Sequence, residues 1–264
     1  MANQGLQIRN LRKKIEKLKE YGCLVAIKTG TEIEDMGFDE ILFLKKISDS
    51  IVPLIVKIGG PEARNDIRNC LKIRVDMILA PMVETVYALS NFVTSATSLQ
   101  QEARISCELA INLESLTAYQ NLDAMIQSTA FKSLQQVTIG RGDLSASMHL
   151  GLDDEEVINI SAKAVRKIAN HGKVTSVGGG FMMENIEEIC HAIPAGRLNS
   201  RHCVIRNDNR LKKNPKATLH HVLSLEKELY LAMSETFLEK RESYLKRIKV
   251  LENRMGNLEL VNAL

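Results

Sequence analysis

Residues 53–80 read PLIVKIGGPEARNDIRNCLKIRVDMILA, and their pattern is the clearest signal of the fold. An apolar run at 53–58 gives way to apolar residues at helical spacing over Pro61–Ile73, and a second apolar run follows at 75–80. Proline suits the first turn of a helix, where the N–H that it lacks would have no intrahelical partner. The stretch therefore predicts a strand, a helix and a second strand parallel to the first.

The same alternation extends in both directions along the chain. Five further apolar runs have the length of strands: CLVAIK at 23–28, ISCELAINL at 105–113, QQVTIG at 135–140, KVTSVG at 173–178 and SRHCVI at 200–205. Helical spacing fills the intervals, over Phe38–Ile47, Thr85–Ser98, Ser115–Phe131, Asp153–His171 and Phe181–Ala192. Such apolar strands must be covered on both faces. We predict a TIM-type (β/α)8 barrel, either incomplete or with its eighth strand near Gly5–Ile8 or Gly30–Asp35.

A long helical stretch follows the last predicted strand. After a polar loop at 206–217, one helix is predicted from Leu219 to about residue 258, with an apolar seam made of Phe237, Tyr244, Ile248, Leu251, Met255 and Leu258. Such a helix rises about 60 Å, more than the roughly 25 Å of a barrel wall. We expect one domain over 1–264, with the barrel at about 21–210 and the C-terminal helix at about 217–258. An exposed seam favours a homo-oligomer built through this helix; the alternative is a helix folded back over the barrel bottom.

Composition narrows the range of partners and compartments. The 264 residues carry a formal charge of +3, no Trp and only 4% aromatic residues, so we expect neither a nucleic-acid nor a membrane partner. The five cysteines are scattered and never paired as C-x-x-C, which argues against a zinc ribbon or a disulfide framework. The first twenty residues form a charged amphipathic pattern without the apolar segment of a signal peptide. These features predict a cytoplasmic protein.

Polar residues stand where each predicted strand ends, which is where a parallel barrel builds its site. In chain order they are Lys28 with Glu32 and Glu34, Lys57 with Gly59 and Gly60, Glu84, Glu114, Gly140 to Asp143, Gly178 to Gly180, and Arg201 with His202. Arg201 and His202 alternate along a strand, so one of them is expected to line the barrel mouth.

Two of these residues predict a metal site. Glu114 and Asp143 follow neighbouring strands, and two hard carboxylate ligands suit Mg²⁺ or Mn²⁺, which take their remaining ligands from water and substrate. A 2-oxo acid offers a carboxylate oxygen and a keto oxygen to such an ion. The glycines beside Arg141 allow backbone N–H groups to approach an anion closely. Alternatively, Glu114 caps the next helix and Asp143 is a turn residue.

The segments VKIGGPEARNDI, ILAPMVETVYAL, LAINLESLTAYQNLDAMI and VTIGRGDLSASMHLG resemble the HpcH/HpaI aldolase and citrate lyase β-subunit family of the phosphoenolpyruvate/pyruvate barrel superfamily. The resemblance runs from about residue 28 to 151 and continues more weakly to 205. Its most specific parts are residues 111–115 and 139–145. It implies a divalent-metal site held by Glu114 and Asp143.

The chain also departs from the family pattern. Family aldolases have an arginine where this chain has Lys57, which supplies charge but no bidentate fork. The family's early histidine is missing from IKTGTEIEDMG at 27–37, so Glu32, Glu34 or a water is left as general base. We predict catalytic roles for Lys57, Glu84, Glu32 and Arg141, with Glu84 in reach of Lys57. Substrate binding is predicted for Gly142, Lys28, Gly179 and Arg201.

These expectations define a function and two competitors. The first is a Mg²⁺-dependent carbon–carbon lyase or aldolase acting on a 2-oxo acid or an acyl-CoA thioester through a metal-stabilised enolate. The second is a non-aldol enzyme of the same superfamily that acts on a phosphorylated or activated acid at the glycine-rich loops. The third is a non-catalytic binding subunit.

Overall fold

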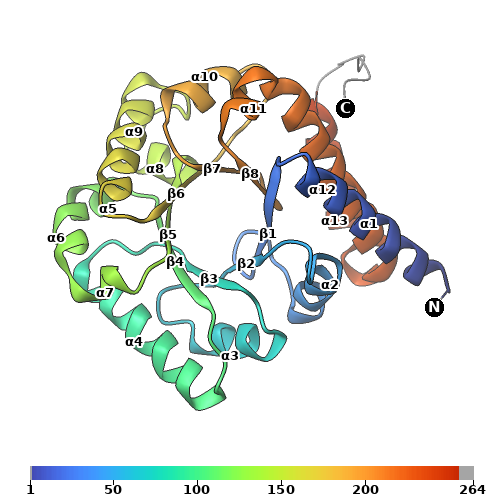
Figure 1. The fold of residues 1–264 in the computed structure, drawn as a ribbon, viewed down its shortest axis with the longest axis horizontal. Coiled ribbons are helices and arrows are strands. Elements are labelled where there is room, and N and C mark those ends of the chain that lie inside the picture. Colours follow the sequence, from blue (N-terminus) through green and yellow to red (C-terminus); the bar gives the residue numbers. More distant parts are fainter. Residues whose placement is uncertain (1, 256–264) are drawn as a thin grey trace.

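The computed structural model describes residues 2–255, and it contains a closed barrel of eight strands surrounded by helices (Figure 1). The strands follow one another around the barrel in chain order, and β1 to β7 run parallel to one another. Their bounds are β1 Leu24–Gly30, β2 Leu54–Lys57, β3 Met77–Ala80, β4 Glu108–Leu113, β5 Gln136–Gly140, β6 Val174–Gly178, β7 Arg197–Asn199 and β8 Cys203–Arg206. The predicted barrel is confirmed.

The eighth strand lies in neither of the two places expected for it. Gly5–Ile8 belongs to the first helix, and the residues after Gly30 form a loop. The predicted run at 200–205 instead overlaps a turn and β8, and β7 precedes that turn. β8 runs antiparallel to both β7 and β1, so Ser200, Arg201 and His202 make the turn at the carboxyl end of the barrel. A strand of three residues is too short for its periodicity to be recognised.

Helices cover the outside of the barrel. They are α1 Ala2–Glu20, α2 Phe38–Ser48, α3 Arg64–Ile73, α4 Val86–Ala103, α5 Leu116–Gln120, α6 Leu122–Gln127, α7 Thr129–Lys132, α8 Arg141–Ser147, α9 Glu155–Ala169, α10 Ile186–Ala192 and α11 Asn209–Lys213, followed by a C-terminal hairpin. The helix predicted over 115–131 is thus three short pieces, and α11 lies inside the expected polar loop. Within residues 2–255, every helix is too short or too polar to cross a lipid bilayer.

The inside of the barrel is layered because side chains alternate along each strand. Ala26, Ile55, Met77, Leu79, Ala110 and Val204 form a small apolar cluster inside the barrel, separate from the large core between strands and helices. Lys28, Lys57 and Asn112 are also buried, and each lies two residues further along its strand than a member of this cluster. The barrel interior therefore turns from apolar to polar towards the carboxyl ends of its strands.

The C-terminal segment is a helical hairpin rather than one helix. α12 (Pro215–Thr236) ends at Phe237, a short 3-10 turn covers Leu238–Lys240, and α13 (Arg241–Met255) packs back on α12. The seam residues Tyr244, Ile248 and Leu251 are buried within the chain. The expected continuous helix with an exposed seam is therefore wrong, because the chain reverses at Phe237; Leu258 lies outside the described residues.

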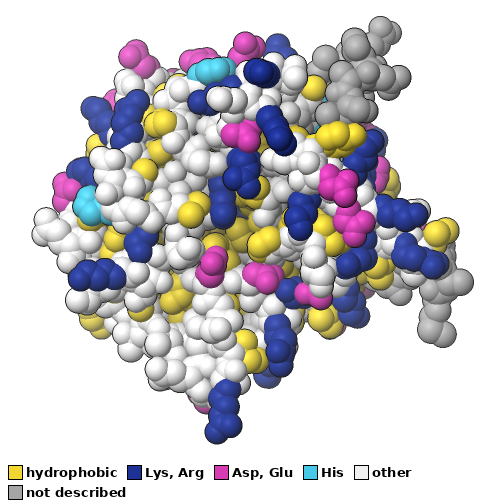
Figure 2. Space-filling view, viewed as in Figure 1, with side chains coloured by type: hydrophobic (Ala, Val, Ile, Leu, Met, Phe, Trp, Pro, Cys, Tyr) yellow, Lys and Arg dark blue, Asp and Glu magenta, His cyan; other side chains and the backbone are white. Residues whose placement is uncertain are grey.

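Charges of both signs are mixed on the face seen in Figure 2. Lys and Arg side chains alternate there with Asp and Glu, and apolar side chains show between them. No field of a single sign covers this face.

Candidate active site

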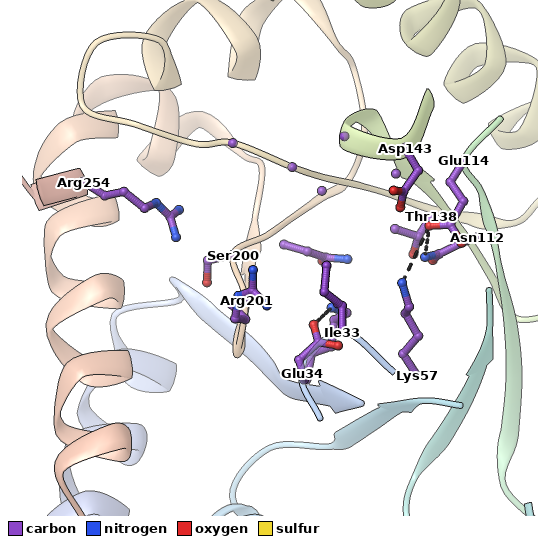
Figure 3. A pocket seen from close by; sticks show the side chains of 17 residues that line it. Ile33, Glu34, Lys57, Asn112, Glu114, Thr138, Asp143, Ser200, Arg201 and Arg254 are labelled. Atoms are coloured by element: carbon purple, nitrogen blue, oxygen red, sulfur yellow. Dashed lines mark hydrogen bonds and ion pairs between the residues drawn. The ribbon is translucent and has the colours of Figure 1, made fainter. Parts of the chain in front are cut away.

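A pocket of about 260 Å³ opens at the carboxyl ends of the strands (Figure 3). All of the residues that line it except Ile33 are polar, charged or glycine. The full lining is Lys28, Ile33, Glu34, Lys57, Asn112, Glu114, Thr138, Gly140, Gly142, Asp143, Gly178, Gly179, Gly180, Asn199, Ser200, Arg201 and Arg254. Predicted site residues from six strand ends thus share one pocket, as expected of a barrel of this kind.

Glu114 follows β4 and is 2% exposed. Its Oε1 accepts a hydrogen bond from the N–H of Met82 at 2.8 Å, and its Oε2 accepts one from Nδ2 of Asn112 at 2.8 Å. A Cβ on Gly140 would lie 2.8 Å from Glu114, so this close approach requires glycine at the end of β5. Ser115, and not Glu114, caps the following helix, because its hydroxyl accepts from the N–H of Ala118.

Asp143 lies in the first turn of α8, which begins directly after β5. Figure 3 shows its carboxylate pointing to the same part of the pocket as that of Glu114. Burial raises the pKa of Glu114, and the charge of Asp143 adds to the rise, while Lys57 and the N–H of Met82 oppose it. A buried carboxylate whose charge is disfavoured by a neighbouring, exposed carboxylate has the electrostatic character of a cation site.

The donor set fits a hard divalent cation. Glu114 and Asp143 supply carboxylate oxygens, and Oδ1 of Asn112, beside Glu114, is buried without a hydrogen-bond partner. A carboxylate that accepts one hydrogen bond at each oxygen keeps lone pairs for a metal. Within residues 2–255, no three His, Cys, Asp or Glu side chains are arranged so that they could hold a metal ion, so water and substrate would supply the other ligands.

Lys57, at the end of β2, is the cationic neighbour of this site. Its Nζ lies 2.5 Å from Oε2 of Glu32 and 3.8 Å from Oε2 of Glu114. Burial lowers the pKa of Lys57, but the charges of Glu114 and Glu32 outweigh burial and hold the pKa above its usual value. Lys57 is therefore a permanent positive charge. The expected contact with Glu84 is replaced by these two.

A second buried pair lies beside the first. Nζ of Lys28 is 3.3 Å from Oε1 of Glu34, and both side chains line the pocket. Burial would raise the pKa of Glu34, yet nearby positive charges, that of Lys28 foremost, bring the pKa down to about 2. Glu34 is therefore a weak proton acceptor, which leaves Glu32 or a water for that role.

Arg141 does not line the pocket, contrary to the catalytic role expected for it. Its buried guanidinium points away, donating to Oδ1 of Asp153 at 3.0 Å and to the carbonyl of Gly179 at 2.6 Å, and it lies against the ring of Phe181. Because α8 starts at Arg141 itself, this side chain leaves the helix on the side away from the pocket. Arg141 positions the loop that contains Gly179.

Glu84 also lies outside the pocket lining. Its carboxylate accepts a hydrogen bond from the hydroxyl of Ser115, and its backbone carbonyl accepts one from Asn121. These bonds fix the loop after β3 against the loop after β4, so Glu84 holds two loops of the site together without lining the pocket. Glu32 reaches the site only through its ion pair with Lys57.

The opposite side of the pocket is basic. Arg201 comes from the turn between β7 and β8, and Arg254 comes from the last turn of α13 (Figure 3). Gly179 and Gly142 also line the pocket, and a Cβ on Gly179 would come within 3.0 Å of the backbone N of Gly142. His202 is fully buried, with Nδ1 2.9 Å from the carbonyl of Lys28.

Sequence reasoning missed several lining residues. Asn112 and Thr138 lie two residues before Glu114 and Gly140 on the same strand faces, so period-two alternation could have identified them. Asn199 ends the strand that was not recognised. Arg254 carries no local signal, because only the reversal of the chain at Phe237 brings α13 to the pocket.

Comparisons with known proteins agree with this architecture. The model of the family described as HpcH/HpaI aldolase/citrate lyase matches residues 27–191. No curated protein matches the chain. Similar solved structures include a citrate lyase from Burkholderia xenovorans LB400 (12% identity, 90% of this chain and 87% of that one, TM-score 0.57) and an HpcH/HpaI aldolase from Desulfitobacterium hafniense DCB-2 (16% identity, 69% and 78%, TM-score 0.55). At this identity they show the fold alone.

Proposed function

Because the chain belongs to the HpcH/HpaI aldolase/citrate lyase family, we propose that it is a divalent-metal-dependent carbon–carbon lyase or aldolase acting on a 2-oxo acid or a related acyl thioester. Membership of the family supports an aldolase- or lyase-type activity. The divalent metal and the class of substrate are proposed here from the residues of the pocket. One observation carries it: Glu114 and Asp143 line one pocket wall beside the permanently charged Lys57.

Glu114 and Asp143 would hold the cation, Mg²⁺ or Mn²⁺, with Asn112 next to them. When bound, the cation supplies Lewis-acid stabilisation of the negative charge that develops on the substrate as a carbon–carbon bond breaks or a proton leaves. Asn112 and the N–H of Met82 hold the Glu114 carboxylate in place through both of its oxygens. Such fixed ligand orientation is typical of metal-binding carboxylates.

Lys57 contributes a second positive charge on the same side. Its raised pKa keeps the amine protonated at neutral pH, so it does not attack a carbonyl as a free amine. The ammonium instead attracts the substrate carboxylate and stabilises charge that develops on the substrate. The family's arginine is replaced here by a compact charge that Glu32 orients at 2.5 Å.

The volume of the pocket supports a small acid. About 260 Å³ lies slightly below the range of about 300–1,000 Å³ that is typical of sites for drug-sized ligands. A pyruvate-sized 2-oxo acid suits this volume, whereas an acyl-CoA thioester would have to leave most of its length outside.

Enolisation can be tested without knowing the second substrate. The protein is incubated with pyruvate and Mg²⁺ in D₂O, and exchange of the methyl protons is followed by proton NMR. We expect catalysed exchange that EDTA abolishes and that Glu114→Gln and Asp143→Asn reduce at least a hundredfold, because each removes a metal ligand. Exchange that persists in EDTA, or at the parent rate in both variants, would exclude the proposed site.

The two competing functions make different predictions in the same experiment. A non-catalytic binding subunit would bind the metal and pyruvate without proton exchange. An enzyme for phosphorylated acids would need a phosphate group at Gly178–Gly180, which line the pocket beside the basic side chains. Exchange with pyruvate alone would therefore favour the lyase over both.

A further inference from the structure

One loop beside the pocket supplies the acidic partners of both pocket lysines. This loop, residues 31–37, connects β1 to α2 and is called the β1–α2 loop below. Its Glu32 forms an ion pair with Lys57. Its Glu34 forms a second ion pair with Lys28. The position of the loop therefore decides how both ammonium groups are oriented in the pocket.

The C-terminal hairpin holds this loop through two backbone carbonyls. Arg247, on α13, donates from Nη2 to the carbonyl of Glu34 at 2.8 Å. Lys240, in the turn before α13, donates to the carbonyl of Asp35. Nζ of Lys240 also lies 2.9 Å from the buried carboxylate of Glu40, in the first turn of α2. Two consecutive residues of the loop are thus tied to the other end of the chain.

The same side of α13 also reaches a second loop of the pocket. Arg247 and Arg254 are seven residues apart, about two helical turns, so their side chains leave the helix on one side. Arg254 donates from Nε and Nη2 to the carbonyl of Phe181, at 3.1 and 2.7 Å. This carbonyl directly follows the pocket glycines 178–180. α13 therefore joins the β1–α2 loop to the loop after β6.

Two further observations identify Arg247 as an anchor of the β1–α2 loop. Its side chain is half-buried, with its guanidinium carbon 5.8 Å from the centroid of the Tyr230 ring on α12, which restricts where the guanidinium can go. Asp35, next to the carbonyl that Arg247 binds, has φ 50°, in the left-handed region that residues other than glycine seldom adopt. Such a conformation persists where the surrounding structure holds it.

We propose that Arg247 is a positioning residue of the site: through the carbonyl of Glu34 it keeps the β1–α2 loop in the conformation in which its two glutamates orient the pocket lysines. The inference rests on the proposed function, since the substrate anion is taken to meet Lys57 beside the metal. α13 lies beyond residues 27–191, the part that the family model matches, so this support is supplied by the chain's own C-terminal hairpin.

Hydrogen–deuterium exchange followed by mass spectrometry tests the anchoring without any assumption about the reaction. Arg247→Met keeps the apolar part of the side chain and removes its charge and its donors. We expect this variant to exchange about fivefold faster or more in peptides over 31–37, because the loop loses a tether, and at the parent rate over β5. Glu252→Gln is the matched control, because it removes only an exposed ion pair of α13 with Lys227 on α12, and it should exchange like the parent.

Oxalate binding in the presence of Mg²⁺, measured by calorimetry, tests whether the anchoring serves the site. Arg247→Met should weaken oxalate binding by about tenfold or more, because the pocket lysines lose their orientation. The affinity for Mg²⁺ alone should not change, since Glu114 and Asp143 follow other strands. Arg247→Lys, whose ammonium can still donate to the carbonyl of Glu34, should restore most of the oxalate affinity. A residue that only stabilised the hairpin would lower the unfolding free energy and leave oxalate binding to the folded protein unchanged.

The possible outcomes separate this inference from the proposed function. Unchanged exchange over 31–37 in Arg247→Met overturns the anchoring, and faster exchange with unchanged oxalate affinity overturns the positioning role; both leave the proposed function standing. A parent protein that binds oxalate but does not catalyse proton exchange of pyruvate overturns the proposed function alone. A parent protein that binds no oxalate overturns both. If Arg247→Met does not fold, Lys240→Met, which removes the other tether of the loop, decides the question by the same two measurements.

Discussion

The ammonium of Lys57 lies 3.8 Å from Oε2 of Glu114, and the two side chains face each other from the ends of β2 and β4. This relationship places a fixed positive charge beside a carboxylate that is taken to hold a metal. We therefore expect Lys57 to lie between the proposed metal and the substrate.

Lys57→Met should separate these two tasks. Removing the charge should weaken binding of oxalate, an enolate mimic, by about tenfold or more, because a charge-assisted contact is worth about 1.4 kcal/mol or above. Binding of Mg²⁺ should change little, since Lys57 is not a ligand. Calorimetry at pH 8 measures both affinities, and Lys57→Arg should retain most of the oxalate affinity. Equal oxalate affinity in the Met variant and the parent would exclude the role.

Glu34 should make the folded state sensitive to acid. Its pKa is lowered to about 2 in the folded protein, so its contribution is fully present above the unfolded pKa of about 4.3 and is lost as the pH falls towards 2. Between pH 6 and pH 3 the parent should lose about 2 kcal/mol more unfolding free energy than Glu34→Gln. Urea denaturation at both pH values checks this, with the exposed Glu102→Gln as a control. Parallel losses in Glu34→Gln and the parent would contradict it.

Tyr244 should hold the C-terminal hairpin together. The side chain is 2% exposed, and its ring centroid lies 5.9 Å from that of Tyr230 on α12. Tyr244→Ala should lower the unfolding free energy by about 3–5 kcal/mol, the usual cost of removing a buried aromatic ring. Tyr244→Phe should cost less than about 1 kcal/mol, because it removes only a contact to the sulfur of Met36. Urea denaturation measures the unfolding free energy of both variants. Similar losses of unfolding free energy in the two would show that packing of the ring does not stabilise the hairpin.

The association of subunits through the C-terminal hairpin stays a prediction, but the residues expected to form the contact change. Tyr244, Ile248 and Leu251 are used within the chain, while Leu238 and Leu245 are 65% and 40% exposed. We expect the parent to sediment well above its monomer mass of 29.5 kDa, and the double variant Leu238→Lys, Leu245→Lys to sediment as a smaller species. A parent protein that sediments as a monomer at micromolar concentration would exclude the idea.

Much of the fold could be predicted because the strands β1 to β6 lie in apolar runs that are followed by helical spacing. The polar residue after such a run is then placed at the barrel mouth by topology alone, which is why Lys57, Glu114 and Asp143 were expected there and line one pocket. The three-residue β7 could not be recognised, since alternation needs more residues than it has.

The direction of the Arg141 side chain, which differs from expectation, and the place of Arg254 in the pocket, which was missed, have a common physical origin. Arg141 occupies the first position of α8, where one residue's change of register decides whether a side chain faces the pocket or the core. Arg254 reaches the pocket only because α12 ends at Phe237 and α13 returns along it. Neither direction is encoded by residue type or spacing near the site; both follow from tertiary packing.

The central claim is that Glu114 and Asp143 bind one divalent cation, and titration of Mn²⁺ into the protein by calorimetry tests it most directly. The parent should bind a single ion. Glu114→Gln and Asp143→Asn should each weaken binding at least tenfold, because each substitution removes an anionic ligand. The fold should survive, because each new side chain has the size of the one that it replaces. Glu84→Gln, which alters a carboxylate outside the pocket lining, should bind Mn²⁺ like the parent. Unchanged Mn²⁺ affinity in both Glu114→Gln and Asp143→Asn would contradict the account.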